Sequence, residues 1–220
     1  MAGTAPRVLM LHGHGQSAEI FYPKTRRLRK AFQDASDEAP FDFEFLSGVW
    51  PAYPDREDRD WYRVWGYGEE ADRIRGLARS LEYIQDTLER KGPFIGIVGF
   101  SSGAAMAALV TSILEKREPM CGLSRKTSHS PFQFTICLSG FKLQNSYYEG
   151  FYRTKILTPS LHVSGSLDAV ITPEQTKSLA SHFHNVQLFE FFRGHYVPQS
   201  KEFCAALTKF LKENLKPNAH

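Results

Sequence analysis

The sequence is poor in cysteine and contains no long hydrophobic run. Cys121, Cys137 and Cys204 are scattered, without paired spacing, among 220 residues; this excludes a disulfide-stabilised scaffold and favours a reducing compartment. The longest apolar run, residues 94–100, is as long as a strand, whereas a membrane-spanning helix needs about 20 residues. The amino terminus has no basic leader followed by an apolar stretch. We therefore expect a cytoplasmic protein without a membrane span.

An excess of either charge is also lacking. Lys and Arg number 27 against 24 Asp and Glu, which leaves a net charge of +3, and no block of Lys and Arg stands out. This balance predicts that the chain does not bind nucleic acid. The composition, 42% hydrophobic and 23% charged, is that of an ordinary folded domain. We expect one domain over residues 1–220, with its core in residues 7–215.

Hydrophobic periodicity predicts that strands and helices alternate along the chain. Apolar or alternating runs predict strands at residues 7–11, 41–46, 94–99, 132–138, 160–163 and 186–191. Helical spacing predicts helices at residues 17–32, 70–90, 102–116, 173–183 and 201–215. Residues 117–130 are polar and predict a mobile surface loop. This order indicates an α/β fold, in which a mostly parallel sheet of about six strands has helices on both faces.

A dinucleotide-binding fold would show a similar alternation, but its fingerprint is incomplete here. The first turn, Gly13-His14-Gly15-Gln16-Ser17-Ala18, lacks the third glycine of that motif. The second predicted strand runs into Leu46-Ser47-Gly48 and does not end at an acidic residue. We therefore predict no dinucleotide site.

The clearest chemical motif is Gly99-Phe100-Ser101-Ser102-Gly103, which lies between a predicted strand and a helix rich in small residues. A Gly-x-Ser-x-Gly sequence in that context is typical of a nucleophile elbow, where a tight turn exposes the central hydroxyl. Glycine is needed on both sides because the turn crowds the backbone. We predict that Ser101 is the nucleophile and that the main-chain N–H of Ser102 is one oxyanion donor.

A serine nucleophile needs a base, and the base needs a carboxylate that orients it. His195 follows the last predicted strand, in a loop at the carboxyl end of the sheet, where ligand sites of such folds lie. Asp168 follows the preceding strand and comes too early to cap the helix predicted from Pro173. Among the other histidines, we expect His162 to pack in the core, and His182 and His184 to be solvated.

The turn after the first strand is expected to supply the second oxyanion donor. We predict the main-chain N–H of His14 for this role, with Gly15 as the second choice. His12 is expected to fix the loop by hydrogen bonding. An alternative is a divalent metal bound by His12, His14 and Asp168, but the sequence has no further ligand cluster and this alternative leaves the elbow without a role.

Together these motifs resemble the fungal serine hydrolase (FSH) family of the α/β-hydrolase superfamily. The matching segments are residues 9–17, 99–105, 139–141, 162–168 and 194–198, in the same order over nearly the whole chain. The resemblance implies ester or thioester hydrolysis by Ser101, Asp168 and His195 without a cofactor. Some fungal members are similar to thioesterases that release polyketide chains from a carrier protein. The family often has an aromatic or aliphatic residue where this chain has His14.

Aromatic residues are concentrated at 50–54 and 61–67, in the loop after the second predicted strand, and at 145–152. We expect most of them to pin loops to the body of the protein and a minority to line an acyl groove. The predicted substrate-binding residues are Trp50, Tyr53, Trp65, Tyr147 and Tyr148. The expected partner is a small-molecule or acyl-thioester substrate, with an acyl carrier protein as an alternative, and the protein is expected to be a monomer or homodimer. A non-catalytic binding module on the same fold stays open.

Overall fold

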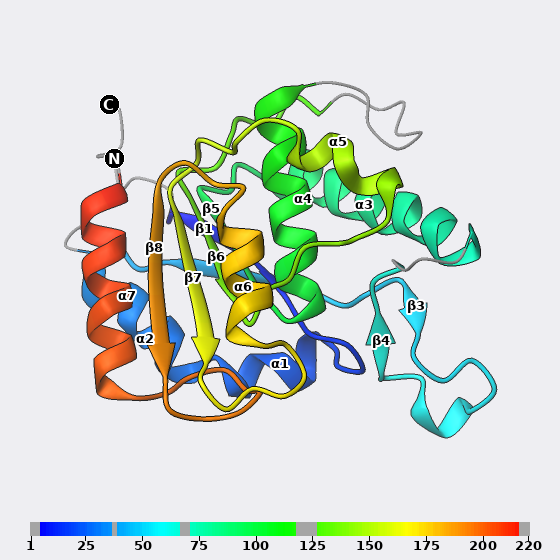
Figure 1. Cartoon of the computed structure of the whole chain (residues 1–220), viewed down its shortest axis with the longest axis horizontal. Helices are drawn as coiled ribbons and strands as arrows, with labels where there is room; N and C mark the ends of the chain where they lie inside the picture. Colours follow the sequence, from blue (N-terminus) through cyan, green and yellow to red (C-terminus); the bar gives the residue numbers. More distant parts are fainter. Residues whose placement is uncertain (1–4, 37–38, 67–70, 118–126, 216–220) are drawn as a thin grey trace.

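The central sheet has six parallel strands, in the order β2-β1-β5-β6-β7-β8 (Figure 1). The computed structural model describes residues 5–36, 39–66, 71–117 and 127–215. The strands of this sheet are β1 (Arg7–Leu11), β2 (Asp42–Leu46), β5 (Gly96–Phe100), β6 (Phe134–Leu138), β7 (Ser160–Gly165) and β8 (Val186–Phe191). A short antiparallel pair, β3 (Trp50–Pro51) and β4 (Arg63–Val64), lies outside it. The predicted parallel α/β sheet is confirmed.

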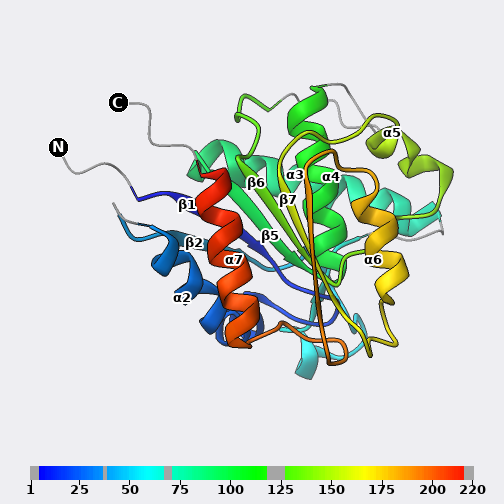
Figure 2. The same ribbon diagram turned by 60° about the vertical axis from the view of Figure 1, so that its left-hand side comes forward.

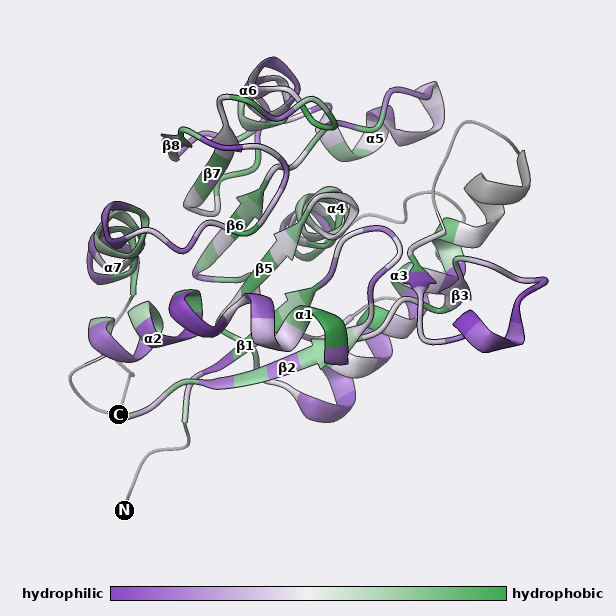
Figure 3. Cartoon of the chain, turned by 90° about the horizontal axis from the view of Figure 1, so that it is seen from below, coloured by the Kyte–Doolittle hydropathy of each residue, from purple (hydrophilic) through white to green (hydrophobic). Residues whose placement is uncertain are grey.

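Helices cover both faces of the sheet, as Figures 2 and 3 show. One face carries α1 (Ala18–Lys24), α2 (Arg26–Ala35) and α7 (Lys201–Asn214). The other carries α3 (Ala71–Lys91), α4 (Ser102–Lys116), α5 (Glu149–Tyr152) and α6 (Pro173–Ala180). The 3-10 turns η1 (Glu57–Arg59) and η2 (Ser146–Tyr148) lie in the connections. In Figure 3 the inner strands β5, β6 and β7 are mostly green, whereas the edge strands β2 and β8 and the helices also carry purple, hydrophilic residues.

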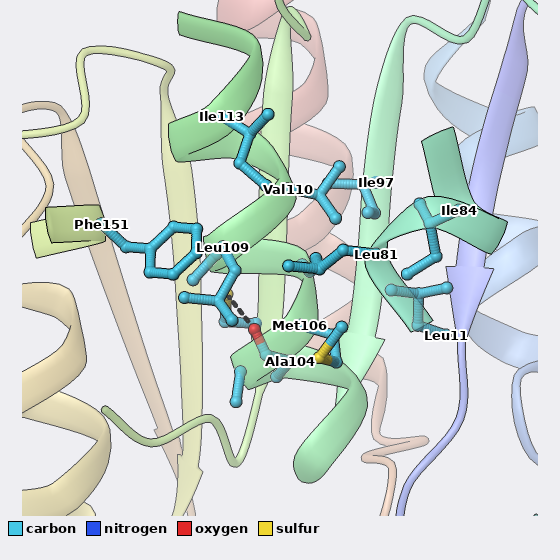
Figure 4. Packing of buried hydrophobic residues seen from close by; sticks show 14 of the residues in the cluster. Leu11, Leu81, Ile84, Ile97, Ala104, Met106, Leu109, Val110, Ile113 and Phe151 are labelled. Atoms are coloured by element: carbon cyan, nitrogen blue, oxygen red, sulfur yellow. Dashed lines mark hydrogen bonds between the residues drawn. The ribbon is translucent and has the colours of Figure 1, made fainter. Parts of the chain in front are cut away.

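Each face of the sheet has its own hydrophobic core. The first joins α1, α2 and α7 to the sheet through residues such as Phe21, Phe32 and Phe203. The second packs α3 and α4 on the opposite face, and Figure 4 shows Leu81 and Ile84 of α3 beside the side chains of α4. Helix α4 is buried almost throughout because alanines allow it to lie close to the strands. Both cores hold the sheet rigidly beneath its carboxyl edge.

The strand order reverses between β1 and β5, which lie side by side with Leu11 opposite Gly99. Strands added before this point extend the sheet in one direction, and later strands extend it in the other. The carboxyl ends of parallel strands at such a reversal leave a crevice in which ligands bind. The turn after β1 and the turn after β5 therefore meet at the expected place for a site.

The helix predicted over residues 17–32 is divided into two, and this prediction was wrong. Ser17 caps the first helix as predicted, its hydroxyl accepting from the Ile20 N–H at 3.4 Å. The break falls at Thr25, whose hydroxyl donates to the Tyr22 carbonyl at 2.9 Å. Pro23 has no N–H to donate within α1, which weakens the turn just before the break. The predicted loop at 117–130 lies mostly outside the described residues.

His162 is packed in the core on β7, as predicted. Only 1% of the residue is exposed, and its ring lies edge-on to Phe183 with centroids 4.8 Å apart. Neither ring nitrogen has a hydrogen-bond partner among the described residues. Burial lowers the pKa of His162 to about 3. The side chain is therefore neutral in the folded protein at neutral and mildly acidic pH.

We expect His162→Leu to stabilise the protein, and more at acidic pH than at neutral pH. At pH 7 the change removes unpaired buried nitrogens, which cost about 1–3 kcal/mol. Below the unfolded pKa of about 6.5, the unfolded wild-type chain binds a proton that the native state rejects until the pH nears 3. This adds about 2–3 kcal/mol to the advantage of the variant at pH 4.5. Urea denaturation at the two pH values measures both effects.

The control for this prediction is His184→Leu, because His184 is exposed. That variant is expected to follow the wild-type pH dependence. An advantage for His162→Leu of the same size at pH 7 and pH 4.5 would contradict the assignment of His162 as a neutral buried group.

Candidate active site

Ser101 stands on the sharp turn between β5 and α4. Its backbone has φ 54° and ψ −119°, a left-handed conformation that a serine rarely adopts. Its own N–H donates to the Leu138 carbonyl at 2.8 Å. A Cβ on Gly99 would lie 2.2 Å from the Gly103 carbonyl oxygen, and a Cβ on Gly103 would lie 2.3 Å from that of Leu11. The two glycines of the motif are therefore required by close approach of the backbone.

Three side chains from separate loops form a continuous hydrogen-bonded line. His195 Nε2 lies 3.0 Å from Ser101 Oγ, and His195 Nδ1 lies 2.7 Å from Asp168 Oδ2. With Asp168 ionised, Nδ1 carries the imidazole proton and donates it to the carboxylate. Nε2 is then the acceptor for the Ser101 hydroxyl. The structure thus brings together the residues predicted as nucleophile, base and acid.

Asp168 is held by the turn that follows β7. Its Oδ1 accepts hydrogen bonds from the N–H groups of Val170 and Ile171, both at 2.9 Å. Only 4% of the residue is exposed. Burial would raise the pKa of Asp168, but the Ile171 N–H, His195 and the Val170 N–H together hold it below its usual value. The carboxylate is therefore charged at neutral pH, and its second oxygen is left for His195.

The loop after β8 carries His195 and is tied to the loop of Asp168. The Leu167 N–H donates to the Arg193 carbonyl at 3.1 Å, and the ring of His195 packs against that of Phe100 with centroids 4.9 Å apart. These contacts fix the imidazole plane between the carboxylate and the hydroxyl. The base is thus positioned before any substrate arrives.

The turn after β1 lies directly against the nucleophile. A Cβ on Gly13 would come within 2.9 Å of the Phe100 ring and 3.3 Å of Ser101 Cβ. His12 is fully buried; its Nε2 accepts from the Gly48 N–H at 2.8 Å, and its Nδ1 donates to the Gly13 carbonyl at 2.7 Å. Burial lowers the pKa of His12 to about 4, so the neutral ring keeps both bonds. The prediction that His12 fixes this loop is confirmed.

The two predicted oxyanion donors lie on the turns that meet at Ser101. Ser102 is the first residue of α4, where main-chain N–H groups have no partner within the helix. His14 lines the cavity that contains Ser101. Gly15, the second choice, has φ +63° and donates its N–H to the Arg63 carbonyl at 3.1 Å. That N–H is engaged, which leaves His14 as the candidate from this turn.

A cavity of about 360 Å³ opens beside Ser101 and His195. Its wall comes from the first turn, the end of α1, the elbow and the loops after β7 and β8. The lining residues are His14, Gln16, Lys24, Phe100, Ser101, Val170, His195, Tyr196, Val197 and Gln199. Sequence reasoning did not assign a lining role to Gln16, Lys24, Val170 or Gln199. Lys24 and Gln199 are 175 residues apart, and no local pattern brings them together.

The five aromatic residues predicted to bind substrate are absent from the described lining of this cavity. Trp65 is 1% exposed and donates its indole N–H to the His12 carbonyl at 2.9 Å. The Trp50 indole donates to the Gly76 carbonyl at 3.1 Å, and Tyr148 is 1% exposed. Tyr53 packs against Tyr62, and Tyr147 packs against Tyr148. Trp50, Trp65 and Tyr148 are thus engaged with other parts of the protein, and a substrate-binding role for the five residues stays a prediction.

In the part of the chain that the structure describes, no cluster of three or more His, Cys, Asp or Glu side chains is arranged to hold a metal ion. Among the same residues, no helix is both long enough and apolar enough to cross a membrane.

The sequence of this chain matches one protein-family model and several known proteins. A family model described as serine hydrolase (FSH1) matches residues 1–207. The esterase OVCA2 of Xenopus tropicalis is 32% identical over 223 residues, covering 93% of each chain. The esterase OVCA2 of Homo sapiens is 32% identical over 232 residues, covering 97% of this chain and 99% of the relative.

Solved structures share the fold at lower sequence identity. Zea mays acyl-protein thioesterase 2 superposes with a TM-score of 0.64 at 18% identity, covering 94% of each chain. Esterase PE8 superposes with a TM-score of 0.65 at 20% identity, covering 97% of this chain and 95% of the other. The predicted α/β-hydrolase fold is confirmed by this likeness.

Proposed function

The chain belongs to the serine hydrolase (FSH1) family, and we propose that it cleaves carboxylic esters through an acyl-enzyme formed on Ser101. It is a serine esterase, as its relatives are. The observation that carries the catalytic assignment is the line of two hydrogen bonds from Ser101 through His195 to Asp168. That geometry supports nucleophilic catalysis because it supplies both a proton acceptor and a means of orienting it.

In the first half of the reaction, Ser101 Oγ attacks the ester carbonyl carbon while its proton passes to His195 Nε2. The carbonyl π electrons move to oxygen, and the resulting oxyanion accepts hydrogen bonds from the main-chain N–H groups of Ser102 and His14. The positive end of the α4 dipole also faces that charge. When the carbonyl re-forms, the bond to the leaving oxygen breaks, and that oxygen takes the proton from His195.

In the second half, water replaces the departed alcohol. His195 Nε2 accepts a proton from the water as its oxygen attacks the acyl carbon, and the same oxyanion donors act again. Collapse breaks the bond to Ser101 Oγ, which recovers its proton from His195. Asp168 stays ionised throughout and stabilises the imidazolium that forms in each half. The products are a carboxylic acid and an alcohol, and the enzyme is regenerated.

A thioester would pass through the same acyl-enzyme, with a thiol as the leaving group. The elbow and the oxyanion donors act on the carbonyl and do not distinguish oxygen from sulfur. Release of an acyl chain from a carrier protein is therefore the second candidate function, supported by exposed residues in the cavity lining, such as Lys24 and Tyr196, which leave Ser101 accessible to a tethered chain.

We expect a fluorophosphonate probe to label the folded protein at Ser101. The probe reacts with a serine hydroxyl only when a base and an oxyanion hole activate it. Peptide mapping of the adduct distinguishes Ser101 from the neighbouring Ser102. The acid-unfolded protein is the control, because the same hydroxyls are then without His195. A folded protein that resists the probe would favour the non-catalytic binding module.

A further inference from the structure

The described residues that line the cavity beside Ser101 include a basic side chain and no acidic one. Among these described residues, Lys24 is the one with a fixed charge. The other polar members are His14, Gln16, Tyr196, Gln199 and the Ser101–His195 pair. An ester with a neutral acyl chain and a neutral alcohol makes no use of an ammonium group in this position.

No described carboxylate neutralises Lys24. The residue ends α1, and no ion pair joins its ammonium to an acidic residue in the described part of the chain. Partial desolvation lowers the pKa of Lys24, and no acidic neighbour offsets it. An anionic ligand is therefore expected to bind Lys24 with a more favourable free energy than it would bind a fully hydrated lysine or one already in an ion pair.

The position of Lys24 at the cavity is set by the backbone. The Gln199 side-chain amide donates to the Lys24 carbonyl at 3.4 Å, and Arg27 donates to the Gln199 carbonyl at 3.1 Å. Gln199 belongs to the same loop as His195. The end of α1 is therefore attached to the loop that carries His195, so the main chain that bears Lys24 keeps its place relative to Ser101 and His195.

Lys24 also begins a basic segment that the overall charge balance conceals. Residues 24–30 contain five basic side chains and no acidic one. Arg27 bonds to the loop of the cavity, whereas Lys30 pairs with Asp34 at 2.9 Å and is not one of the residues that line the cavity. Such a segment attracts anions toward the mouth of the site.

A second cavity, on the other side of the first turn, has the opposite character. Its volume is about 660 Å³, and it is lined in part by Glu19, Asp60, Glu82 and Asp86. Of the two arginines in its lining, Arg63 pairs with Asp60 at 2.8 Å and Arg79 lies over the Trp50 ring. The negative excess of this lining therefore comes from Glu19, Glu82 and Asp86. An anion approaching this edge of the sheet is thus favoured at Ser101 and disfavoured next to it.

We infer that the substrate cleaved at Ser101 carries an anionic group, a carboxylate or a phosphate, that the Lys24 ammonium binds at the mouth of the cavity. This inference rests on the proposed function. The anion has two sources: the far end of a dicarboxylic acyl chain, or the alcohol or thiol that leaves, as in a phosphate-bearing thioester. Lys24 is then a specificity-determining residue, since it distinguishes charged from neutral substrates without acting on the carbonyl.

The test uses two matched substrate pairs on the full chain. Mono-p-nitrophenyl suberate against p-nitrophenyl octanoate places the charge on the acyl side. Octanoyl-coenzyme A against octanoyl-N-acetylcysteamine places it on the leaving group. The wild type is expected to prefer the anionic member of one pair, and Lys24→Met is expected to lower kcat/KM for that member about tenfold. The neutral member is expected to change less than about twofold.

Two variants serve as controls. Lys24→Arg keeps the charge and is expected to retain the preference, while Lys30→Met removes one charge from the same segment away from the cavity and is expected to leave the preference intact. If Lys24→Met keeps the wild-type ratio in both pairs while neutral octanoate is still hydrolysed, the anion inference is overturned and the esterase stands. If the wild type hydrolyses none of the four substrates and resists the probe, the proposed function fails and takes the inference with it.

Discussion

Replacing Ser101 with alanine is expected to lower kcat for p-nitrophenyl octanoate by about 10⁴- to 10⁶-fold. The reason is that, in the proposed mechanism, Ser101 Oγ, which lies 3.0 Å from His195 Nε2, forms the covalent bond to the substrate. Without it, the imidazole can activate only a water molecule, and no turn of the chain holds that water in position as the β5–α4 turn holds the Ser101 hydroxyl. The oxyanion donors remain, so a small residual rate over the uncatalysed reaction is expected.

The control for Ser101→Ala is Ser181→Ala, at an exposed position at the end of α6. That variant is expected to turn over at the wild-type rate. Both variants are also expected to keep the wild-type melting temperature within a few degrees, because alanine at position 101 occupies the same strained backbone conformation as serine. Turnover by Ser101→Ala above about one hundredth of the wild-type rate would place the nucleophile elsewhere.

The parts of the fold and site that the sequence predicted are those encoded locally. The elbow needs glycines on either side of Ser101 wherever the chain folds in this way, and the structure shows the backbone contacts that require them. Asp168 and His195 could be assigned because parallel strands place all their carboxyl ends at one edge. A residue just after β7 and another just after β8 therefore lie near Ser101, whatever the side chains between them.

The aromatic residues show the limit of that reasoning. Trp65 lies close to the turn after β1, but its indole N–H donates to the His12 carbonyl. The ring therefore supports this turn and does not line the cavity. Composition indicates that a tryptophan will be buried; it does not indicate whether substrate or protein will cover it. The division of the first helix at Thr25 belongs to the same class, because apolar spacing continues across the break.

The residues that line the cavity could not be predicted from the sequence, for a different reason. Lys24 lines the cavity because α1 ends at this residue, beside the loop after β8, and because the Gln199 side chain donates to the Lys24 carbonyl. Both facts depend on how two distant segments pack, and neither leaves a periodic or motif signal. The five basic residues in 24–30 were a usable clue, but an overall charge of +3 concealed them.

Replacing Asp168 with asparagine is expected to lower kcat by about 10³- to 10⁴-fold with little loss of stability. The Oδ1 atom of the new side chain is expected to keep the hydrogen bonds from the Val170 and Ile171 N–H groups, which are 2.9 Å long in the wild type, so the turn after β7 is preserved. The amide nitrogen then faces His195 Nδ1 and donates to it. The imidazole proton is driven to Nε2, which can no longer accept the proton of Ser101.

Measuring kcat together with the urea midpoint across pH separates orientation of the base from structural support. Because the pKa of Asp168 is held below its usual value, the wild-type carboxylate stabilises the fold above its unfolded pKa, and this contribution is lost as the pH falls through its folded pKa. The asparagine variant cannot titrate there and is expected to lose less stability in that acidic window. Asp168→Ala also removes the acceptor of the Val170 and Ile171 N–H groups. That variant is expected to lose both activity and stability at pH 7. If Asp168→Asn kept more than a tenth of the wild-type kcat, the hydrogen bond to His195 would be structural, and His195 would find its orientation from Phe100 and its own loop alone.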